Sequence, residues 1–356
     1  MKALIQTAYG EPKRVLELQQ VPDVVPGPGE VAIAMEAAVV HVADLHTVTG
    51  RERFRKPLPR TPGYEGIGRV LAVGSAVEHI KMGDRVLPPL GSGTHREQLT
   101  ANADSVIRAP EGNAPQLALL TLNSAAAFLM LQSFVTLQEG DWIIQNAANS
   151  SVGRVVLQLA HQMKLHIVNV VKSPEVGAEL HGEGATVVLV DDEDLVQRVA
   201  TATLGALIRV GLDAVGGAAT ARLAGCLGEG GTIVNYGAMS GHACEIPGQL
   251  LAARDLRLVG FNTGRQLARY SAEECSALYE RLGTLLSAGA LSARLAAVYP
   301  IERAIEAYNH TGRVGDKRSG KVVIQFRDVP TPSSSRPAAE IDPPAPEPAR
   351  VSSQTS

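Results

Sequence analysis

The segment Ala147–Gly153, with the sequence AANSSVG, carries residue types that suit the binding of a diphosphate. A dinucleotide-binding turn presents backbone N–H groups at the start of a helix, where the helix dipole favours negative charge. The three glycines usual in such a turn correspond here to Ala148, Ser150 and Gly153. Alanine and serine still leave room for the diphosphate, and a serine hydroxyl adds a hydrogen bond that glycine lacks. The residues predicted to bind the diphosphate are Asn149, Ser150, Ser151, Val152 and Gly153.

The next strand-like run, HIVNVV, ends in Lys172 and Ser173 and bears on the choice of dinucleotide. In NAD-selective folds a carboxylate near this point binds the ribose 2′-hydroxyl and repels an added phosphate. A cation and a hydroxyl suit that phosphate, so we predict NADPH as cofactor, with Lys172 and Ser173 among its ligands. Two alternatives stand beside this prediction: Lys172 as an ordinary solvated lysine, and an α/β unit that binds no nucleotide.

An alternation of strands and helices between about residues 141 and 261 must position these segments. The strand-like runs are DWIIQN, HIVNVV, ATVVLV, IRVGLDAV, GTIVNYG and LRLVGF. The segments VGRVVLQLAHQM and DEDLVQRVATATL, which lie between them, have apolar residues at helical spacing. Six such strands predict a doubly wound parallel sheet of the Rossmann type. A phosphate turn at the head of this sheet is a much stronger signal than the same turn alone.

The residues before this alternation contain short β-like runs interrupted by Gly and Pro. The runs are MKALIQTAYG, GEVAIAMEAAVV, GIGRVLAVG, GDRVLPPL and HREQLTANADSVIRAP. They predict a mainly antiparallel, barrel-like unit. Helix-like stretches and a last strand-like run, GKVVIQF, continue past the six strands of the dinucleotide fold, so we expect them to return to the barrel-like unit.

The predicted fold class is therefore α/β, with a mainly β barrel and a six-stranded Rossmann unit. The predicted regions are a catalytic domain at 1–120, an NADPH-binding domain at 121–264, a return to the catalytic domain at 265–327 and a tail at 328–356. The tail is rich in Pro, Ser and Ala, which predicts disorder, either as an inert extension or as a docking segment.

Bulk properties narrow the class of protein. The 356 residues are 45% hydrophobic, enough for two packed domains, and the formal net charge of -3 gives no basic field for nucleic acid or membrane. No window approaches the roughly 18 uninterrupted apolar residues of a spanning helix, and the amino terminus lacks the pattern of a secretory signal. Three widely spaced cysteines argue against a disulfide framework, so we expect a cytoplasmic protein.

The chain resembles the medium-chain dehydrogenase/reductase superfamily over about residues 1–326. The motifs that carry the resemblance are IIQNAANSSVG, NVVK, DAVGG, GGTIVNYGAMSG, LRLVGF, GTHREQ and GKVVIQF. It is most similar to zinc-free enoyl-thioester reductases of the mitochondrial type and to their quinone-reductase-like relatives. The resemblance implies a GroES-like catalytic domain and a homodimer. Further cofactor contacts that it implies are Tyr236, Gly237, Met239, Phe261 and Lys321.

Zinc enzymes similar to this scaffold have a Cys in the early loop and a His in a GHE motif. Here the early loop reads VVHVADLH and the later motif GYEG, with Tyr64 at the His position, and no four-cysteine lobe is present. We therefore predict no metal site. The alternative is a site formed by His41, His46 and Glu65.

The predicted reaction is the reduction of a double bond conjugated to a carbonyl, in an enoyl thioester or an enone. Hydride goes to the β-carbon, donors stabilise the enolate, and a proton goes to the α-carbon. The alternatives are a quinone oxidoreductase and an NADPH-binding regulatory or assembly protein without catalysis.

The donor positions depart from the family that the chain resembles. Glu52 aligns with the family's Tyr and His41 with its Asn, whereas Asn123 matches a family Asn. We predict His41, Tyr64 and Asn123 as catalytic residues, with His41 as the first choice of donor. The alternatives are that His41 packs in support of the loop and that Tyr64 only fills volume.

Glu52 is not predicted as the acid, because the arginines around it favour its ionised form. It lies in a basic run that is completed by Arg51, Arg53, Arg55, Lys56 and Arg60. This run suits the phosphates of a coenzyme A or carrier-protein thioester, or it is a solvated loop. His95 is predicted to stack near the pocket.

Overall fold

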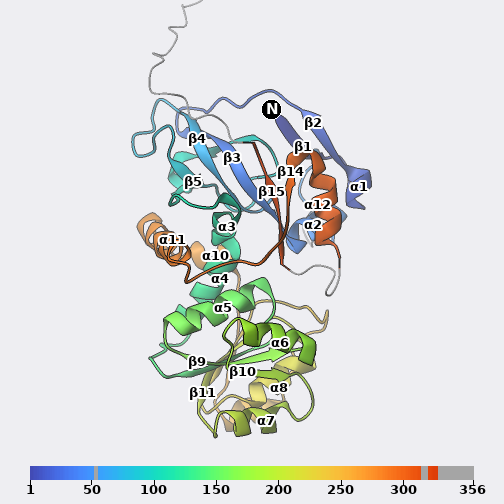
Figure 1. Ribbon diagram of the computed structural model, residues 1–356, viewed down its shortest axis with the longest axis vertical. Helices are drawn as coiled ribbons and strands as arrows, with labels where there is room; N and C mark the ends of the chain where they lie inside the picture. Colours follow the sequence, from blue (N-terminus) through green and yellow to red (C-terminus); the bar gives the residue numbers. More distant parts are fainter. Residues whose placement is uncertain (52–54, 314–319, 328–356) are drawn as a thin grey trace, which may run out of the picture.

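The computed structural model describes residues 1–51, 55–313 and 320–327, which form two lobes joined by helices (Figure 1). Glu52, Arg53 and the tail at 328–356 lie outside the described residues. The upper lobe in Figure 1 contains the early strands together with the last strands of the chain, and the lower lobe contains the parallel sheet.

The upper lobe is built around one mixed sheet with the strand order β14-β15-β3-β4-β5-β7, in which β6 also pairs with β3. A separate pair, β1-β2, lies beside it. The strands are β1 (Lys2–Gln6), β2 (Leu16–Gln20), β3 (Glu30–Val40), β4 (Gly66–Val73), β5 (Arg85–Leu87), β6 (Gln98–Asn102), β7 (Ile107–Arg108), β14 (Leu295–Pro300) and β15 (Lys321–Gln325). The central strand β3 is buried along nearly its whole length, which explains its continuous apolar sequence.

Short helices close the edges of this sheet. They are α1 (Pro12–Val15), α2 (Val42–Thr49), η1 (Ala103–Ser105), η3 (Ile301–Arg303) and α12 (Ala304–Thr311). Helix α2 follows β3 directly and ends at Gly50, whose φ of 72° is the left-handed value that favours glycine at a helix end. The early loop of the sequence analysis is therefore mostly helical.

The lower lobe is a six-stranded parallel sheet with the order β10-β9-β8-β11-β12-β13. Its strands are β8 (Trp142–Gln145), β9 (His166–Val171), β10 (Val187–Val190), β11 (Ile208–Asp213), β12 (Thr232–Asn235) and β13 (Arg257–Gly260). Its helices are α5 (Ser151–Gln162), α6 (Pro174–Gly182), α7 (Leu195–Ala202), α8 (Ala218–Gly225), α9 (Gly248–Ala253) and α10 (Thr263–Leu267). The strand order reverses between β8 and β11, and doubly wound sheets bind ligands at that point.

The two lobes are joined through α3 (Ala114–Leu117), the π-helical turn η2 (Leu120–Ser124), α4 (Ala125–Gln132) and α11 (Ala272–Ser287). One apolar cluster runs from β3 through these helices into α5 and the parallel sheet. Among the described residues, only Ala114–Gln132 has the length and apolarity of a membrane span, and 78% of its window is buried inside the protein. Burial between the lobes accounts for this apolar sequence.

The predicted fold class is confirmed, and each of the six strand-like runs forms a strand of the parallel sheet. Strand β15 pairs with β3, and β14 pairs with β15, so the chain does pass back into the upper sheet. The exact domain boundaries remain a prediction. The sequence analysis did not anticipate α2, β14 or the π-helical turn.

Candidate functional site

The turn between β8 and α5 has the geometry of an anion-binding helix start. Ser150 caps α5 with extended backbone angles, and its Oγ accepts a hydrogen bond from the N–H of Gly153 at 3.1 Å. A Cβ on Gly153 would lie 2.6 Å from the carbonyl oxygen of Ala148, so only glycine permits this close packing. The left-handed residue is Ala147, with φ of 46°, where a glycine would be less strained. The amides of Ser151 and Val152 have no acceptor within the helix and suit a diphosphate.

Buried polar contacts hold this turn from behind. Arg154 is 8% exposed, donates from Nε to the carbonyl oxygen of Asn149 at 3.1 Å, and pairs with Glu179 on α6 and with Glu183 at the end of that helix. Gln145 donates to the carbonyl oxygen of Gly153 at 2.9 Å. The position of the turn is therefore set by these side chains together with the single glycine at 153.

Asp213, at the end of β11, ties three strand ends together. It is fully buried and accepts hydrogen bonds from Asn146 at 2.7 Å, Thr220 at 2.7 Å and Asn235 at 3.0 Å. The backbone N–H of Gly216 donates to it at 3.0 Å. Burial alone would raise the pKa of Asp213, but these donors outweigh burial and hold its pKa below the ordinary value. The edge of the sheet that faces the phosphate turn is thus fixed by an ionised carboxylate.

Eight buried side-chain polar atoms of the described residues lack a hydrogen-bond partner, and two of them belong to predicted site residues. These two are Nδ2 of Asn123, a residue that is 7% exposed, and the hydroxyl of Tyr236. Burial raises the pKa of Tyr236, so its hydroxyl remains protonated and able to donate. Unpaired buried donors are costly unless a ligand accepts from them. Together with the open amides of the turn, they fit a nicotinamide dinucleotide.

A cavity of about 510 Å³ opens at the ends of β12 and β13. Its lining includes Tyr236, Gly237 and Phe261, which were predicted as cofactor contacts. Arg265 and Phe134 also line it, and Phe134 meets Phe261 edge to face with ring centroids 6.3 Å apart. The cavity therefore combines aromatic walls with a cationic rim.

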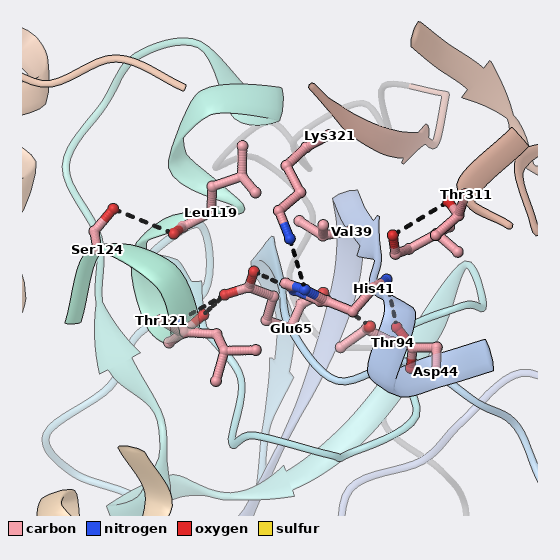
Figure 2. A network of polar contacts seen from close by, with 12 residues as sticks. Val39, His41, Asp44, Glu65, Thr94, Leu119, Thr121, Ser124, Thr311 and Lys321 are labelled. Atoms are coloured by element: carbon pink, nitrogen blue, oxygen red, sulfur yellow. Dashed lines mark hydrogen bonds and ion pairs between the residues drawn. The ribbon is translucent and has the colours of Figure 1, made fainter. Parts of the chain in front are cut away.

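The upper lobe contributes a row of three side chains, which Figure 2 shows: Glu65 and His41 are buried, and Lys321 is half-buried. His41 is 4% exposed and lies between Glu65 and Lys321. Its Nε2 is 2.5 Å from Oε1 of Glu65, and its Nδ1 is 3.1 Å from Nζ of Lys321. Both ring nitrogens are therefore occupied, and His41 does not present a free donor to a substrate.

The other carboxylate oxygen of Glu65 is held by the π-helical turn. Oε2 accepts from the Thr121 hydroxyl at 3.0 Å and from the N–H of Leu122 at 2.7 Å. The same turn carries Asn123 and packs against α5. The row of side chains is thus connected to the segment that lies between the two lobes.

Asp44 is a second buried carboxylate beside His41. It is 1% exposed and accepts a hydrogen bond from the N–H of His41 at 2.8 Å. Burial raises the pKa of Asp44 to about 6, and the attraction of His41 offsets this only in part. The start of α2 therefore carries a carboxylate that titrates near neutral pH.

The remaining predicted site residues lie outside the row formed by Glu65, His41 and Lys321. Lys172 is exposed directly after β9, and Ser173 is the N-cap residue of α6. Met239 is 70% exposed. The ring of Tyr64 has Nζ of Lys56 at 5.6 Å from its centroid. Their functional roles remain predictions.

The prediction that His95 stacks near the pocket is wrong. His95 is fully buried, with Nδ1 2.9 Å from the Tyr308 hydroxyl and Nε2 3.0 Å from the carbonyl oxygen of Val39. Burial lowers its pKa to about 4, so the ring is neutral and joins β3 to α12 as part of the core.

In the described part of the chain, no group of three or more His, Cys, Asp or Glu side chains is arranged to hold a metal ion. His46 is exposed and takes no part in the pair formed by His41 and Glu65. The sequence analysis named Glu65 only as a metal ligand and did not foresee its contact with His41. The contact between His41 and Lys321 carries no local sequence signal, because the two residues lie at opposite ends of the chain.

Each of the two lobes matches the model of a known protein family. A family model described as "Alcohol dehydrogenase GroES-like domain" matches residues 27–111, and one described as "Zinc-binding dehydrogenase" matches residues 151–281. The first covers most of the upper sheet and the second covers the parallel sheet from the phosphate turn onward.

Individual proteins extend this likeness over most of the chain. The mitochondrial enoyl-[acyl-carrier-protein] reductase of Mus musculus is 33% identical over 317 residues, which are 86% of this chain and 85% of that protein. A mycobacterial quinone oxidoreductase superimposes with a TM-score of 0.82 at 27% identity, covering 91% of this chain and 99% of the other. A mutant of Etr1p in complex with NADP and crotonyl-CoA gives a TM-score of 0.79 at 25% identity, with the same coverage.

The sheet order, the helix start at Ser150 and these matches agree with one another. The NAD(P)-binding architecture of the lower lobe and the GroES-like upper lobe are those of an oxidoreductase. The chain belongs to the medium-chain dehydrogenase/reductase superfamily and, within it, to the family of the mitochondrial enoyl-[acyl-carrier-protein] reductases.

Proposed function

We propose that this protein uses NADPH to reduce a carbon–carbon double bond conjugated to a carbonyl, and that its substrate is an enoyl thioester. The observation that carries the proposal is the 33% identity, over 86% of the chain, to an enoyl-[acyl-carrier-protein] reductase. The phosphate turn, the Asp213 network and the unpaired donors of Asn123 and Tyr236 support it.

Bound NADPH supplies the hydride that adds to the β-carbon. The chain's own residues would hold the dinucleotide in place: the amides of Ser151 and Val152 would bind the diphosphate, and Lys172 and Ser173 would bind the 2′-phosphate. Asn123 and the aromatic wall of the cavity orient the reacting ring. Fixed geometry of this kind lowers the barrier because little reorganisation remains for the reaction step.

Preference for NADPH over NADH rests on the residues after β9. Lys172 is exposed there and free to approach a phosphate, and the strand ends in no carboxylate. A carboxylate at this point is the usual reader of the ribose 2′-hydroxyl in NAD-selective folds.

The reaction is proposed to need no zinc. Tyr64 stands where zinc enzymes of this scaffold have a His, and a phenol is not among the usual ligands of zinc. Dialysis against a strong chelator is expected to leave turnover unchanged, whereas loss of activity that zinc alone restores would contradict the proposal.

One experiment separates the three candidate functions. NADPH consumption is measured with enoyl thioesters, simple enones and quinones, and turnover of the thioesters is expected to be fastest. The quinone alternative is favoured by the likeness to the mycobacterial quinone oxidoreductase, and faster quinone turnover would establish it. Binding of NADPH with no turnover of any substrate would support the regulatory or assembly alternative.

A homodimer is proposed through the edge strand β13. Among the described residues, strand β13 pairs with β12 alone, and its Leu258 is 43% exposed. An exposed sheet edge is a ready template for a second strand. Light scattering is expected to give the mass of a dimer, and Leu258→Lys is expected to weaken it; a monomeric parent protein would overturn the proposal.

Residence in the cytoplasm is also a proposal. It is supported by three cysteines that are all free, as in a reducing compartment. Fractionation of the source cells is expected to recover the protein with cytoplasmic markers, and recovery with an organelle would overturn this.

A further inference from the structure

We propose that Lys321 is the proton donor of the reaction, and that His41 and Glu65 are positioning residues that aim its ammonium group. This inference rests on the proposed double-bond reduction. It replaces the prediction that His41 donates the proton and the prediction that Lys321 binds the cofactor.

The contacts of His41 determine which of its ring nitrogens carries the proton. An ammonium group has three donors and no acceptor, so the 3.1 Å contact with Lys321 requires Nδ1 of His41 to accept. The ring proton then lies on Nε2 and is donated to Glu65 over 2.5 Å. This arrangement leaves the imidazole neutral, with one acceptor directed at Lys321.

Glu65 is held rigidly by its hydrogen bonds. Its side chain is fully buried and accepts three hydrogen bonds, from His41, from Thr121 and from the N–H of Leu122. A carboxylate held in this way fixes both the orientation and the tautomer of the histidine that it contacts. Rotation of the His41 ring would break the contacts on both of its sides.

His41 and Lys321 differ in their access to a substrate. His41 is 4% exposed and both of its ring nitrogens are occupied, so it cannot reach a substrate. Lys321 is only half-buried and begins β15, and Figure 2 shows its side chain reaching from that strand down to the His41 ring. Lys321 is therefore the member of the row that combines a transferable proton with access to the space outside the core.

The row formed by Glu65, His41 and Lys321 lies next to the π-helical turn. Glu65 is bonded to the π-helical turn, which carries Asn123 with its unpaired amide and packs against the helix that begins at the phosphate turn. The π-helical turn therefore both holds Glu65, at one end of the row, and carries the amide of Asn123, which has no hydrogen-bond partner within the described residues. Of the other candidates, Tyr64 has Nζ of Lys56 at 5.6 Å from its ring centroid, whereas Lys321 contacts His41.

The reduction needs one hydride, which NADPH would supply, and one proton, which Lys321 supplies and water restores. After hydride addition, the β-carbon holds a new C–H bond and the electron pair of the double bond lies on the enolate oxygen. The ammonium charge of Lys321 stabilises that oxygen, an N–H bond of Lys321 breaks, and a C–H bond forms at the α-carbon. The neutral amine then takes a proton from water through the exposed side of Lys321.

The test compares Lys321→Met with the parent protein, with crotonyl thioester as substrate and NADPH affinity measured separately by calorimetry. The variant is expected to bind NADPH within about twofold of the parent, while kcat falls by about a hundredfold, as for loss of a general acid. Lys321→Arg is expected to stay slow, because a guanidinium does not release its proton. The matched control is Lys164→Met, an exposed lysine paired with Glu139, which is expected to keep parental kcat.

Positioning is tested by Glu65→Gln and His41→Gln. Each is expected to lower kcat by about tenfold with little change in the KM for NADPH, and to move the alkaline limb of the pH profile that reports Lys321. Nitrogen-15 NMR of the His41 ring is expected to show the neutral tautomer with the proton on Nε2. A doubly protonated ring would overturn the inference whether or not any substrate is turned over.

The outcomes separate this inference from the proposed function. If the parent reduces the thioester and Lys321→Met keeps its kcat, Lys321 is not the donor, although the proposed function stands. If Lys321→Met loses NADPH affinity in parallel with activity, Lys321 is a cofactor ligand and the inference is wrong. If the parent oxidises no NADPH with any thioester or enone, the proposed function fails and this inference fails with it.

Discussion

The two lobes each bury an aspartate, and the two carboxylates behave in opposite ways. Asp213 in the parallel sheet accepts hydrogen bonds from several side chains and backbone amides, and its pKa lies below the ordinary value. Asp44 in the upper lobe accepts from the N–H of His41, and burial raises its pKa to about 6. Burial is nearly complete for both, so the number of donors decides which one remains charged.

The difference between the pKa values of the two aspartates matches the different functions proposed for the two lobes. The lower lobe must hold a dinucleotide in one geometry, and its polar groups are saturated around Asp213. The upper lobe must move a proton, and there His41 contacts both a carboxylate that titrates close to neutral pH and a partly exposed lysine. Saturated networks give rigidity, whereas partly paired groups respond to ligands and to pH.

The largest effect is expected from Asp213→Ala. The change leaves donors of Asn146, Thr220 and Asn235 buried without an acceptor, so unfolding free energy should fall by about 3 kcal/mol and NADPH binding should be lost. Urea unfolding at neutral pH measures this. Because the folded pKa is lowered, the stability that Asp213 contributes is present above about pH 4 and is lost as the pH falls. A loss below about 1 kcal/mol would contradict the rigid role of the network.

The next effect concerns pH and Asp44. Its folded pKa is raised, so the folded protein binds this proton more tightly than the unfolded chain, and ionisation opposes folding as the pH rises through about 6. Asp44→Asn still accepts from His41 and never ionises. Relative to the parent, its unfolding free energy should therefore improve by about 2 kcal/mol between about pH 4 and pH 7.5. Parallel urea unfolding curves of the two proteins test this, and a pH-independent difference would rule out a titrating Asp44.

A smaller effect is expected at the phosphate turn. Ser150→Ala removes the cap of α5 and should cost about 1 kcal/mol of unfolding free energy. Ser150→Asp keeps a capping oxygen but adds negative charge where the diphosphate binds. The aspartate variant should therefore be as stable as the parent and bind NADPH much more weakly, as measured by urea unfolding and calorimetry. Equal NADPH affinity in all three proteins would show that the dinucleotide binds elsewhere.

The smallest effect is expected at Lys172. An exposed ion pair is worth up to about 1 kcal/mol, so Lys172→Met should reduce the preference for NADPH over NADH by about fivefold. The ratio of kcat/KM for the two cofactors measures this, with NADH as the internal control. An unchanged ratio would mean that other residues read the 2′-phosphate.

The sequence predicted those parts of the molecule that depend on local patterns. Buried parallel strands are continuous apolar runs, and the phosphate turn must lie between the first strand and its helix, so both were visible along the chain. Strand β14 was missed because none of its residues is buried and its sequence has no clear apolar pattern, and α2 was missed because its residues were interpreted as a loop.

The site itself depended on contacts between distant segments. His41 and Lys321 were each named, but their contact arises only when β15 pairs with β3. Asp213 appeared only as part of a DAVGG motif, because its donors come from other strands. Which groups are saturated and which are left unpaired is set by packing, and no pattern within one segment contains that information.

The most direct test of the account uses NADPH that carries deuterium at the transferable position, with crotonyl thioester in ordinary water. The account predicts a saturated thioester with deuterium at the β-carbon and a solvent proton at the α-carbon, as determined by mass spectrometry and NMR. Deuterium on a carbinol carbon, or no oxidation of NADPH at all, would contradict it.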